Sequence, residues 1–273
     1  MRRWPGRMLL YAALLAGAAL ALLPMLWMVS ASLMRTGEAS TYPPRLFPRA
    51  VTFEHYRDLF TRLDLGRAFL NSAIVSVSVT LLSIVVNSMA GYALAKFRFR
   101  GRDRLFTVLS AGLVVPVQVS MLPLFLLFKS MGLINSYWAV IIPGMSSIFG
   151  IFLIRQYVLA LPDDLLDAAR IDGAGELRIY RSVVLPVITP ILATFAIFTF
   201  LSTWNDFMWP LIVLSDGSMY TLPVALANLV GEHVQDTELM MAGSVLTVLP
   251  VLLTFLFLQR YYVQGITAGS IKG

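Results

Sequence analysis

The chain has 273 residues, of which 58% are hydrophobic and only 13% charged, and its formal net charge at pH 7 is +6. Soluble domains carry about 25% charged residues, so this composition excludes an ordinary soluble protein and predicts one that lies in lipid. The absence of cysteine excludes disulfides and thiolate metal sites. No lysine lies in a GxxxxGK[ST] phosphate loop, and the two histidines, His55 and His233, are far apart in the sequence. Nucleotide binding, catalysis and a metal site within this chain are therefore not predicted.

Six segments are apolar and long enough to cross a bilayer as helices, since a crossing takes about 20 residues. They are residues 8–30, 68–95, 105–128, 138–159, 187–214 and 239–258. The sequence thus predicts an all-α, polytopic membrane protein with a single transmembrane domain over residues 1–273. The first segment follows three arginines and ends in small residues, as a signal peptide does, but its length favours a retained helix.

Basic residues predict how these segments are oriented. If the N-terminus lies in the cytoplasm, 14 of the 21 lysines and arginines fall on the cytoplasmic side, and the densest group is KFRFRGRDR at 96–104. Lysine and arginine in short loops favour the cytoplasmic side, so both termini are expected there. We interpret the 96–104 group as a topological anchor, with an anionic-lipid site as the alternative.

The long outer loop between the first two segments contains two expected elements. TYPPRLFP at 41–48 is predicted to be extended, because a residue before proline avoids the helical region. After Thr52, which can cap a helix, one helical face carries five apolar or aromatic residues: Phe53, Tyr56, Leu59, Phe60 and Leu63. This pattern predicts a helix on the outer membrane surface; packing against its own bundle is the alternative.

A polar insert, ALPDDLLDAARIDGAGELRIYRSVVLP at 160–186, separates the fourth and fifth segments on the expected cytoplasmic side. Pro162 and the two aspartates after it favour the start of a helix. Gly173 can take the left-handed conformation that ends one. A second short helix is predicted from Glu176 toward Val184, before Pro186 begins the next span. Small alanines would let another backbone approach closely, so both a docking role and a plain connector stay open from these features alone.

DAARIDGA followed by LP resembles the coupling loop in permease subunits of ATP-binding-cassette importers, whose pattern is EAA, two residues, DGA, and LP further on. The matching residues are Ala168, Ala169, Asp172, Gly173, Ala174, Leu185 and Pro186. Asp167 stands where the pattern has glutamate, which puts the partner of that first carboxylate in doubt. The resemblance implies that these residues, Asp167 included, contact an ATPase subunit.

The likeness covers nearly the whole chain and is closest to the smaller, six-span permease subunit of maltose-type carbohydrate importers. It includes TFLSTWNDFMWPL at 199–211, the tail QRYYVQGITAGSIKG at 259–273 and residues 71–102. In that family two homologous permeases form a heterodimer in the bacterial inner membrane, and separate ATPase subunits bind ATP and Mg. A periplasmic or lipid-anchored protein delivers the sugar. The resemblance thus implies a non-enzymatic chain with no cofactor of its own and no nucleic-acid partner, whose tail reaches toward the ATPases.

Polar residues within the spans are candidates for the solute path, since ionisable and amide groups are costly in lipid. The candidates are Trp204, Asn205 and Asp206 late in the fifth segment, together with Asn87 and Gln118. Aromatic, amide and carboxylate groups suit sugar binding. The alternatives are an interfacial anchor for Trp204 to Asp206 and a helix–helix contact for each of the others.

The outer segment 215–238 carries four acidic residues and no lysine or arginine. The family resemblance implies that it contacts the solute-binding protein, while a plain surface turn is the alternative. Two alternative functions make different demands on the sequence. A permease for glycerol-3-phosphate or a related polyol ester would need a cationic site along the path. An ion-driven secondary transporter would need carboxylates near the middle of the spans, and these are almost absent.

Overall fold

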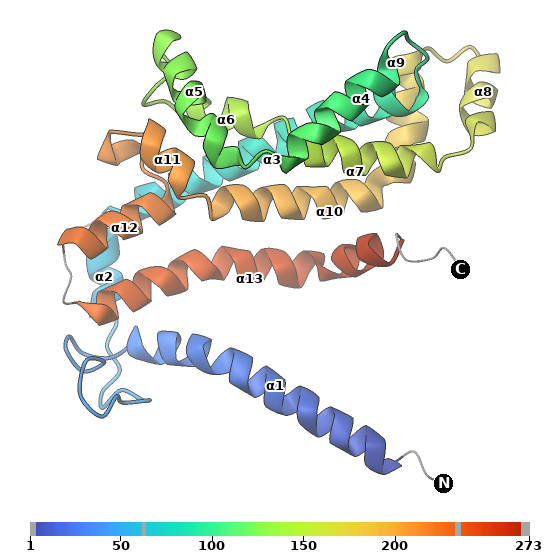
Figure 1. Ribbon diagram of the computed structural model, residues 1–273. Coiled ribbons are helices and arrows are strands. Elements are labelled where there is room, and N and C mark those ends of the chain that lie inside the picture. Colours follow the sequence, from blue (N-terminus) through green and yellow to red (C-terminus); the bar gives the residue numbers. More distant parts are fainter. Residues whose placement is uncertain (1–3, 62–63, 233–235, 269–273) are drawn as a thin grey trace. The chain divides into compact units, whose positions relative to one another are not determined.

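The computed structural model describes residues 4–61, 64–232 and 236–268 (Figure 1). All regular structure in these ranges is helical, and five helices, or six if one bent pair counts as a span, are long and apolar enough to cross a membrane. The contacts divide the chain into two compact units, residues 1–66 with 222–250 and residues 67–221 with 251–273. Each is described by itself, and the single transmembrane domain stays a prediction.

The first unit is built on three helices and the start of a fourth. They are α1 (Trp4–Ala31), α2 (Glu54–Thr61), α12 (Leu222–Glu232) and α13 (Thr237–Ala268), of which the part up to Pro250 belongs here. The predicted segments 8–30 and 239–258 lie within α1 and α13. Most large apolar side chains of α1 are exposed, as expected of a helix that faces lipid or a partner.

Polar contacts hold the outer loop to the rest of this unit. Glu238, fully buried in the first turn of α13, accepts a hydrogen bond from the Ala39 amide at 2.6 Å. The predicted amphipathic helix is α2, but its buried side chains are His55 and Leu59, whereas Phe53 before it and Phe60 on it are exposed. His55 is held inside by the Met34 carbonyl at 2.9 Å. The predicted helix is present, and its apolar residues divide between packing within the unit and exposure, so the choice between a surface helix and packing on the bundle stays open.

The second unit contains the helices from α3 to α11. They are α3 (Leu65–Lys96, which starts in the first unit), α4 (Arg102–Ala111), η1 (Gly112–Val114), α5 (Val117–Ser130), α6 (Trp138–Gly144), α7 (Ile148–Leu159), α8 (Asp163–Ile171), α9 (Glu176–Ile179), η2 (Tyr180–Val184, a π-helix), α10 (Leu185–Trp204), α11 (Met208–Val213) and η3 (Gly217–Met219). The predicted segment 68–95 lies within α3. Helices α7 and α10 run side by side (Figure 1).

Three of the six predicted segments are not continuous helices. Segment 105–128 breaks between η1 and α5, with a bend of 105°, because Val115 precedes Pro116 and is extended. Segment 138–159 is interrupted between α6 and α7 by Ser147, which is extended and caps α7. Segment 187–214 is interrupted between α10 and α11, where Pro210 lacks the amide that a continuous helix would need.

The polar insert also differs from its prediction at one end. Its second helix does not stop before Pro186 but runs on without a break from α9 through η2 into α10. Proline normally clashes with the carbonyl four residues earlier, here that of Ser182. The wider π turn over Tyr180–Val184 contains that residue and accommodates the proline. Of the predicted tail, residues 259–268 continue α13, and 269–273 lie outside the described residues.

Close helix packing in the second unit depends on two glycines. A Cβ on Gly91 of α3 would lie 2.9 Å from Ile154 Cγ2 and 3.1 Å from the Arg155 backbone nitrogen on α7. A Cβ on Gly150 of α7 would lie 2.4 Å from the Phe195 ring on α10. These helices therefore share one apolar core with little room for extra atoms, and the core includes Ile154, Phe195 and the end of the polar insert.

We expect the Gly91→Ala substitution to destabilise the chain by about 1–3 kcal/mol, because α7 must move away from the new methyl group. The measurement is thermal unfolding of the purified chain in detergent. Gly17→Ala in α1 is the matched control, since a Cβ there meets nothing within 4 Å and alanine favours a helix. Equal unfolding temperatures for the two variants would contradict the proposed tight contact.

Candidate functional site

The polar insert folds as a helix, a glycine turn and a second helix, as predicted. Pro162 is extended at the start of α8, and Asp163 and Asp164 occupy its first turn, where acidic groups favour the helix dipole. Gly173 has a positive φ of 78°. The Ala174 amide donates to the Ala169 carbonyl and the Gly173 amide to that of Arg170, each at 3.0 Å. This pair of bonds is a Schellman motif, which ends α8 and reverses the chain.

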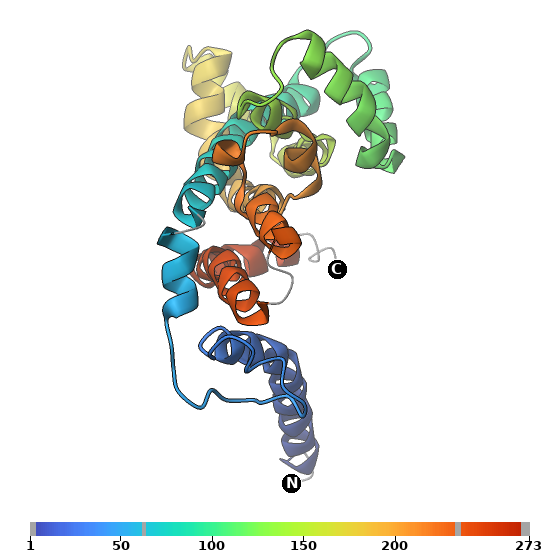
Figure 2. The ribbon, with the colours of Figure 1, turned by 90° about the vertical axis from the view of Figure 1, so that its left-hand side faces the viewer.

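One face of α8 is packed on the core of the second unit. Leu166 is fully buried beside Ile179 and Val184, and Ala169 and Ala174 pack against the same cluster. This packing gives the insert a fixed position on the ends of α7 and α10. Both ribbon views place α8 at the margin of the unit (Figure 1, Figure 2).

The other face of the insert exposes apolar side chains. Ile171 is 87% exposed and Leu177 62% exposed, with Leu165 also exposed near them in the sequence. Ala168 and Asp172, two of the motif residues, are exposed as well. Large apolar groups exposed on a polar element are typical of surfaces that bind another protein or a membrane.

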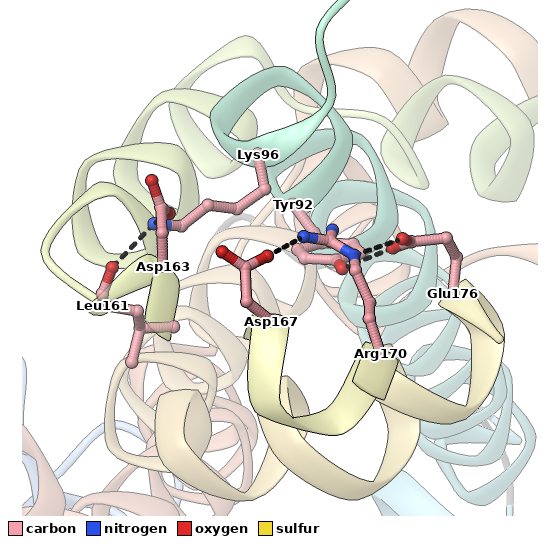
Figure 3. A network of polar contacts seen from close by, with 7 residues as sticks. All are labelled: Tyr92, Lys96, Leu161, Asp163, Asp167, Arg170 and Glu176. Carbon is pink, nitrogen blue, oxygen red and sulfur yellow. Dashed lines mark hydrogen bonds and ion pairs between the residues drawn. The ribbon is translucent and has the colours of Figure 1, made fainter. Parts of the chain in front are cut away.

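Arg170 joins the two helices of the insert (Figure 3). Its Nη1 donates to Asp167 Oδ1 at 2.7 Å and its Nε to Glu176 Oε1 at 2.9 Å. The second oxygen of Glu176 accepts from Tyr92 Oη on α3 at 2.9 Å. Asp167, where the family pattern has glutamate, therefore has a partner within the chain. Its carboxylate and that of Glu176 fix Arg170 across the glycine turn.

A second contact ties the start of α8 to the end of α3. Lys96 Nζ donates to Asp163 Oδ1 and to the Leu161 carbonyl, both at 2.6 Å (Figure 3). The hydrogen bond from Lys96 holds the pKa of Asp163 below its usual range. The lysine side chain is only 7% exposed although it is charged, so these two oxygens are its main compensation for burial.

Sequence reasoning found the motif but missed the residues that hold it in place. Leu185 is half-buried and Pro186 exposed at the start of α10, while Tyr92, Lys96 and Glu176 supply the polar contacts. The sequence could have pointed to Tyr92 and Lys96. They are four residues apart, so they lie on one face of a helix, and they stand at the end of a predicted span next to the polar insert. Tyr180 was also missed; its hydroxyl lies 2.6 Å from Ser88 Oγ on α3.

The solute-path candidates do not gather in one place. Trp204 is buried and packs on Phe69 and Phe200, with ring centroids 5.3 and 5.7 Å away. Asn87 is also buried, and its side chain bonds Ser83, the Met145 carbonyl and the Ser147 amide at the break before α7. Both therefore have structural roles in this chain.

The remaining candidates are more accessible. Asn205 is exposed and donates to the Leu201 carbonyl at 2.8 Å, and Gln118 is exposed at the start of α5. Asp206 is half-buried and accepts a long hydrogen bond, 3.4 Å, from the Trp209 amide. It alone of the five candidates lines two adjoining cavities, of about 470 and 310 Å³.

Comparison with known proteins gives a consistent result. Residues 84–268 match the family described as binding-protein-dependent transport system inner membrane component. The chain is 39% identical over 263 residues to the arabinooligosaccharides transport system permease protein AraQ of Halalkalibacterium halodurans, covering 94% of this chain and 93% of that one. It is 34% identical over 266 residues to the lactose transport system permease protein LacG of Rhizobium radiobacter, covering 96% and 95%.

The fold is found in a solved structure as well. A chain from the crystal structure of a bacterial ABC transporter involved in the import of the acidic polysaccharide alginate superposes with a TM-score of 0.83 and 25% sequence identity, covering 96% of this chain and 98% of that one. The predicted all-α permease fold and the family resemblance are thus confirmed. The chain belongs to the inner-membrane components of binding-protein-dependent transport systems, a family of multi-pass permeases of ABC importers.

Proposed function

We propose that this chain is one of two permease subunits of an ATP-driven importer for a sugar or oligosaccharide, and that the polar insert is where an ATPase subunit docks. The observation that carries the docking role is the form of the insert. It exposes the large apolar side chains of Ile171 and Leu177 and is fixed to the core of the second unit through Leu166. A sugar as the transported solute is supported by the relatives, whose names specify arabinooligosaccharides and lactose.

Transmission of force follows from how the insert is attached. Because α9, η2 and α10 form one uninterrupted helical run, a displacement of α8 moves α10 directly. The Arg170–Glu176–Tyr92 contacts tie the same displacement to α3. Closure of two ATPases on ATP would thus move two spans together, which is the rigid-body motion that alternating access requires.

The remaining partners are part of the same proposal. The chain pairs with a homologous permease, the ATPases are separate subunits that bind ATP and Mg, and both termini lie in the cytoplasm, as the basic residues favour. The segment 215–238 contacts the solute-binding protein that the family description implies. It is not a plain surface turn, because it contains η3 and the helix α12.

The alternatives have less support. An ion-driven secondary transporter does not fit a family whose transport depends on a binding protein. A phosphate-ester permease would want a cation at the path, and the residues that line the two cavities at Asp206 include no lysine, arginine or histidine.

The turn at Gly173 provides a test of coupling. Gly173→Val forces a β-branched residue into left-handed backbone, so we expect the α8 position to be lost and uptake to fall at least tenfold while ATP hydrolysis by the complex persists. Gly173→Asn should keep most uptake, since asparagine tolerates this conformation. Uptake and hydrolysis are measured together in proteoliposomes. Gly132→Val, at another glycine with positive φ, is the matched control; equal losses in both valine variants would contradict a specific coupling role.

The exposed apolar face provides a test of docking. We expect Ile171→Asp to weaken binding of the ATPase subunit at least tenfold, because a charge replaces an apolar group that the interface must desolvate. The measurement is co-purification of tagged ATPase with the permease pair, at equal permease abundance. Val51→Asp, another exposed apolar residue in the expected outer loop, should have no effect. Undiminished binding by Ile171→Asp would show that the ATPase docks elsewhere.

The Lys96–Asp163 contact predicts a dependence on pH. Because the pKa of Asp163 is lowered in the folded chain, the contact stabilises the insert above the carboxyl's unfolded pKa, about 3.9, and the stabilisation is lost as the pH falls through the lower folded pKa. A nitroxide on Ala168→Cys, in a chain without other cysteines, should become more mobile in that range. With Asp163→Asn added, mobility should be high already at pH 7. Asp172→Asn is the control and should behave as the parent.

A further inference from the structure

Three interrupted spans meet at one cavity. The breaks between η1 and α5, between α6 and α7 and between α10 and α11 contribute Val117, Ser147 and Asp206 to its lining, and α3 adds Ser83. Ser83, Val117 and Ser147 lie near the middle of their spanning segments. With a volume of about 470 Å³ and an adjoining cavity of about 310 Å³, the space matches the roughly 300–1,000 Å³ of small-molecule sites.

Broken helices at the depth of a membrane need an explanation. Irregular backbone is tolerated there only where protein buries it or where it lines a water-filled cavity. Asn87 satisfies the break before α7, with Oδ1 2.9 Å from the Ser147 amide. At the break before α11, Asp206 accepts hydrogen bonds from the backbone amides of Trp209, at a long 3.4 Å, and of Met208, and it is half-buried at the cavity. Its carboxylate therefore keeps capacity to accept further hydrogen bonds.

The lining has the chemistry of a site for a neutral polyhydroxyl compound. Ser202 and Thr203 of α10 bring hydroxyl groups beside Asp206, and Phe198 and Trp209 bring aromatic surface. A carboxylate and hydroxyls can pair with sugar hydroxyls, while aromatic faces cover the apolar C–H face of a sugar ring. Among the described residues that line the two cavities, Asp206 is the one ionisable group, so an anionic ligand would meet an uncompensated like charge.

We propose that this cavity is a sugar-binding subsite on this subunit that accepts uncharged sugar residues and rejects acidic ones, with Asp206, Thr203 and Ser202 as its contacts. The proposal rests on the importer function proposed above and adds the selection against charge. The solved relative, by contrast, imports an acidic polysaccharide.

The test uses the complete importer in proteoliposomes, with arabinotriose and lactose as uncharged probes and trigalacturonate as the acidic one. For whichever of the two uncharged probes the wild-type importer takes up, we expect Thr203→Val to raise the KM for uptake at least fivefold without changing ATP hydrolysis. Thr189→Val, on the same helix but outside the cavity, should leave KM unchanged. Asp206→Asn keeps a capping side chain for α11, so the fold should persist, while competition by trigalacturonate should rise at least threefold.

A second measurement does not depend on activity. Ser202→Cys is the only cysteine that the chain then contains, and with cysteine-free partner subunits its alkylation by a small maleimide reports access to the cavity. We expect the uncharged probe to slow alkylation at least fivefold and trigalacturonate not to slow it. Ser130→Cys, exposed and outside both linings, is the control.

The outcomes separate the two proposals. If the wild-type importer takes up neither uncharged probe, the proposed function fails. If it takes up a probe but Thr203→Val leaves KM unchanged and Ser202→Cys is not protected, the importer function stands and the sugar subsite is overturned. Equal protection by trigalacturonate would overturn the selection against charge.

Discussion

In hydrocarbon every backbone amide and carbonyl must find a partner inside the protein, and most features of this chain follow from how that constraint is met. Continuous helices meet it along α1, α3 and α13. Where prolines or extended residues interrupt a span, specific side chains take over. Asn87 serves the break between α6 and α7, where its side chain donates to the Met145 carbonyl and accepts from the Ser147 amide, and it also donates to Ser83 on its own helix. Its burial is thus a structural requirement, which explains why its polarity alone did not identify a solute contact.

The same constraint explains the form of the polar insert. Outside the spans, water can satisfy the backbone, and the chain reverses sharply at Gly173 without strain. Arg170 then makes the turn rigid, because its guanidinium binds carboxylates on both sides of it. Charge-assisted bonds of this kind are stronger than neutral ones. At an exposed site their main effect is to fix orientation rather than to add much stability, and fixed orientation is what a docking element needs.

Hydrophobicity and local motifs predicted much of this fold. The all-α class, the position of the six apolar segments, the glycine turn and the family were all visible in the sequence, because each depends on neighbouring residues. What could not be predicted depends on contacts between distant segments. The apolar content of 105–128 gave no sign of the 105° bend. The sequence also contained no sign that Lys96 would contact Asp163 or that Tyr92 would contact Glu176, because the residues of these pairs are 67 and 84 positions apart.

The two sites are connected by one element. The helical run from Glu176 to Trp204 is 29 residues long, which at 1.5 Å per residue spans roughly 43 Å. The polar insert, where we propose that an ATPase docks, leads into one end of it, and Ser202 and Thr203 lie at the other, with Asp206 just beyond. The opposite lining of the cavity, Val117 and Ser147, comes from helices that are not continuous with the insert. A shift of the run along its own axis would therefore move the proposed sugar contacts of α10 past the lining residues of α5 and α7. Sugar binding in the cavity and closure of the ATPases would thus both depend on the position of this one helical run.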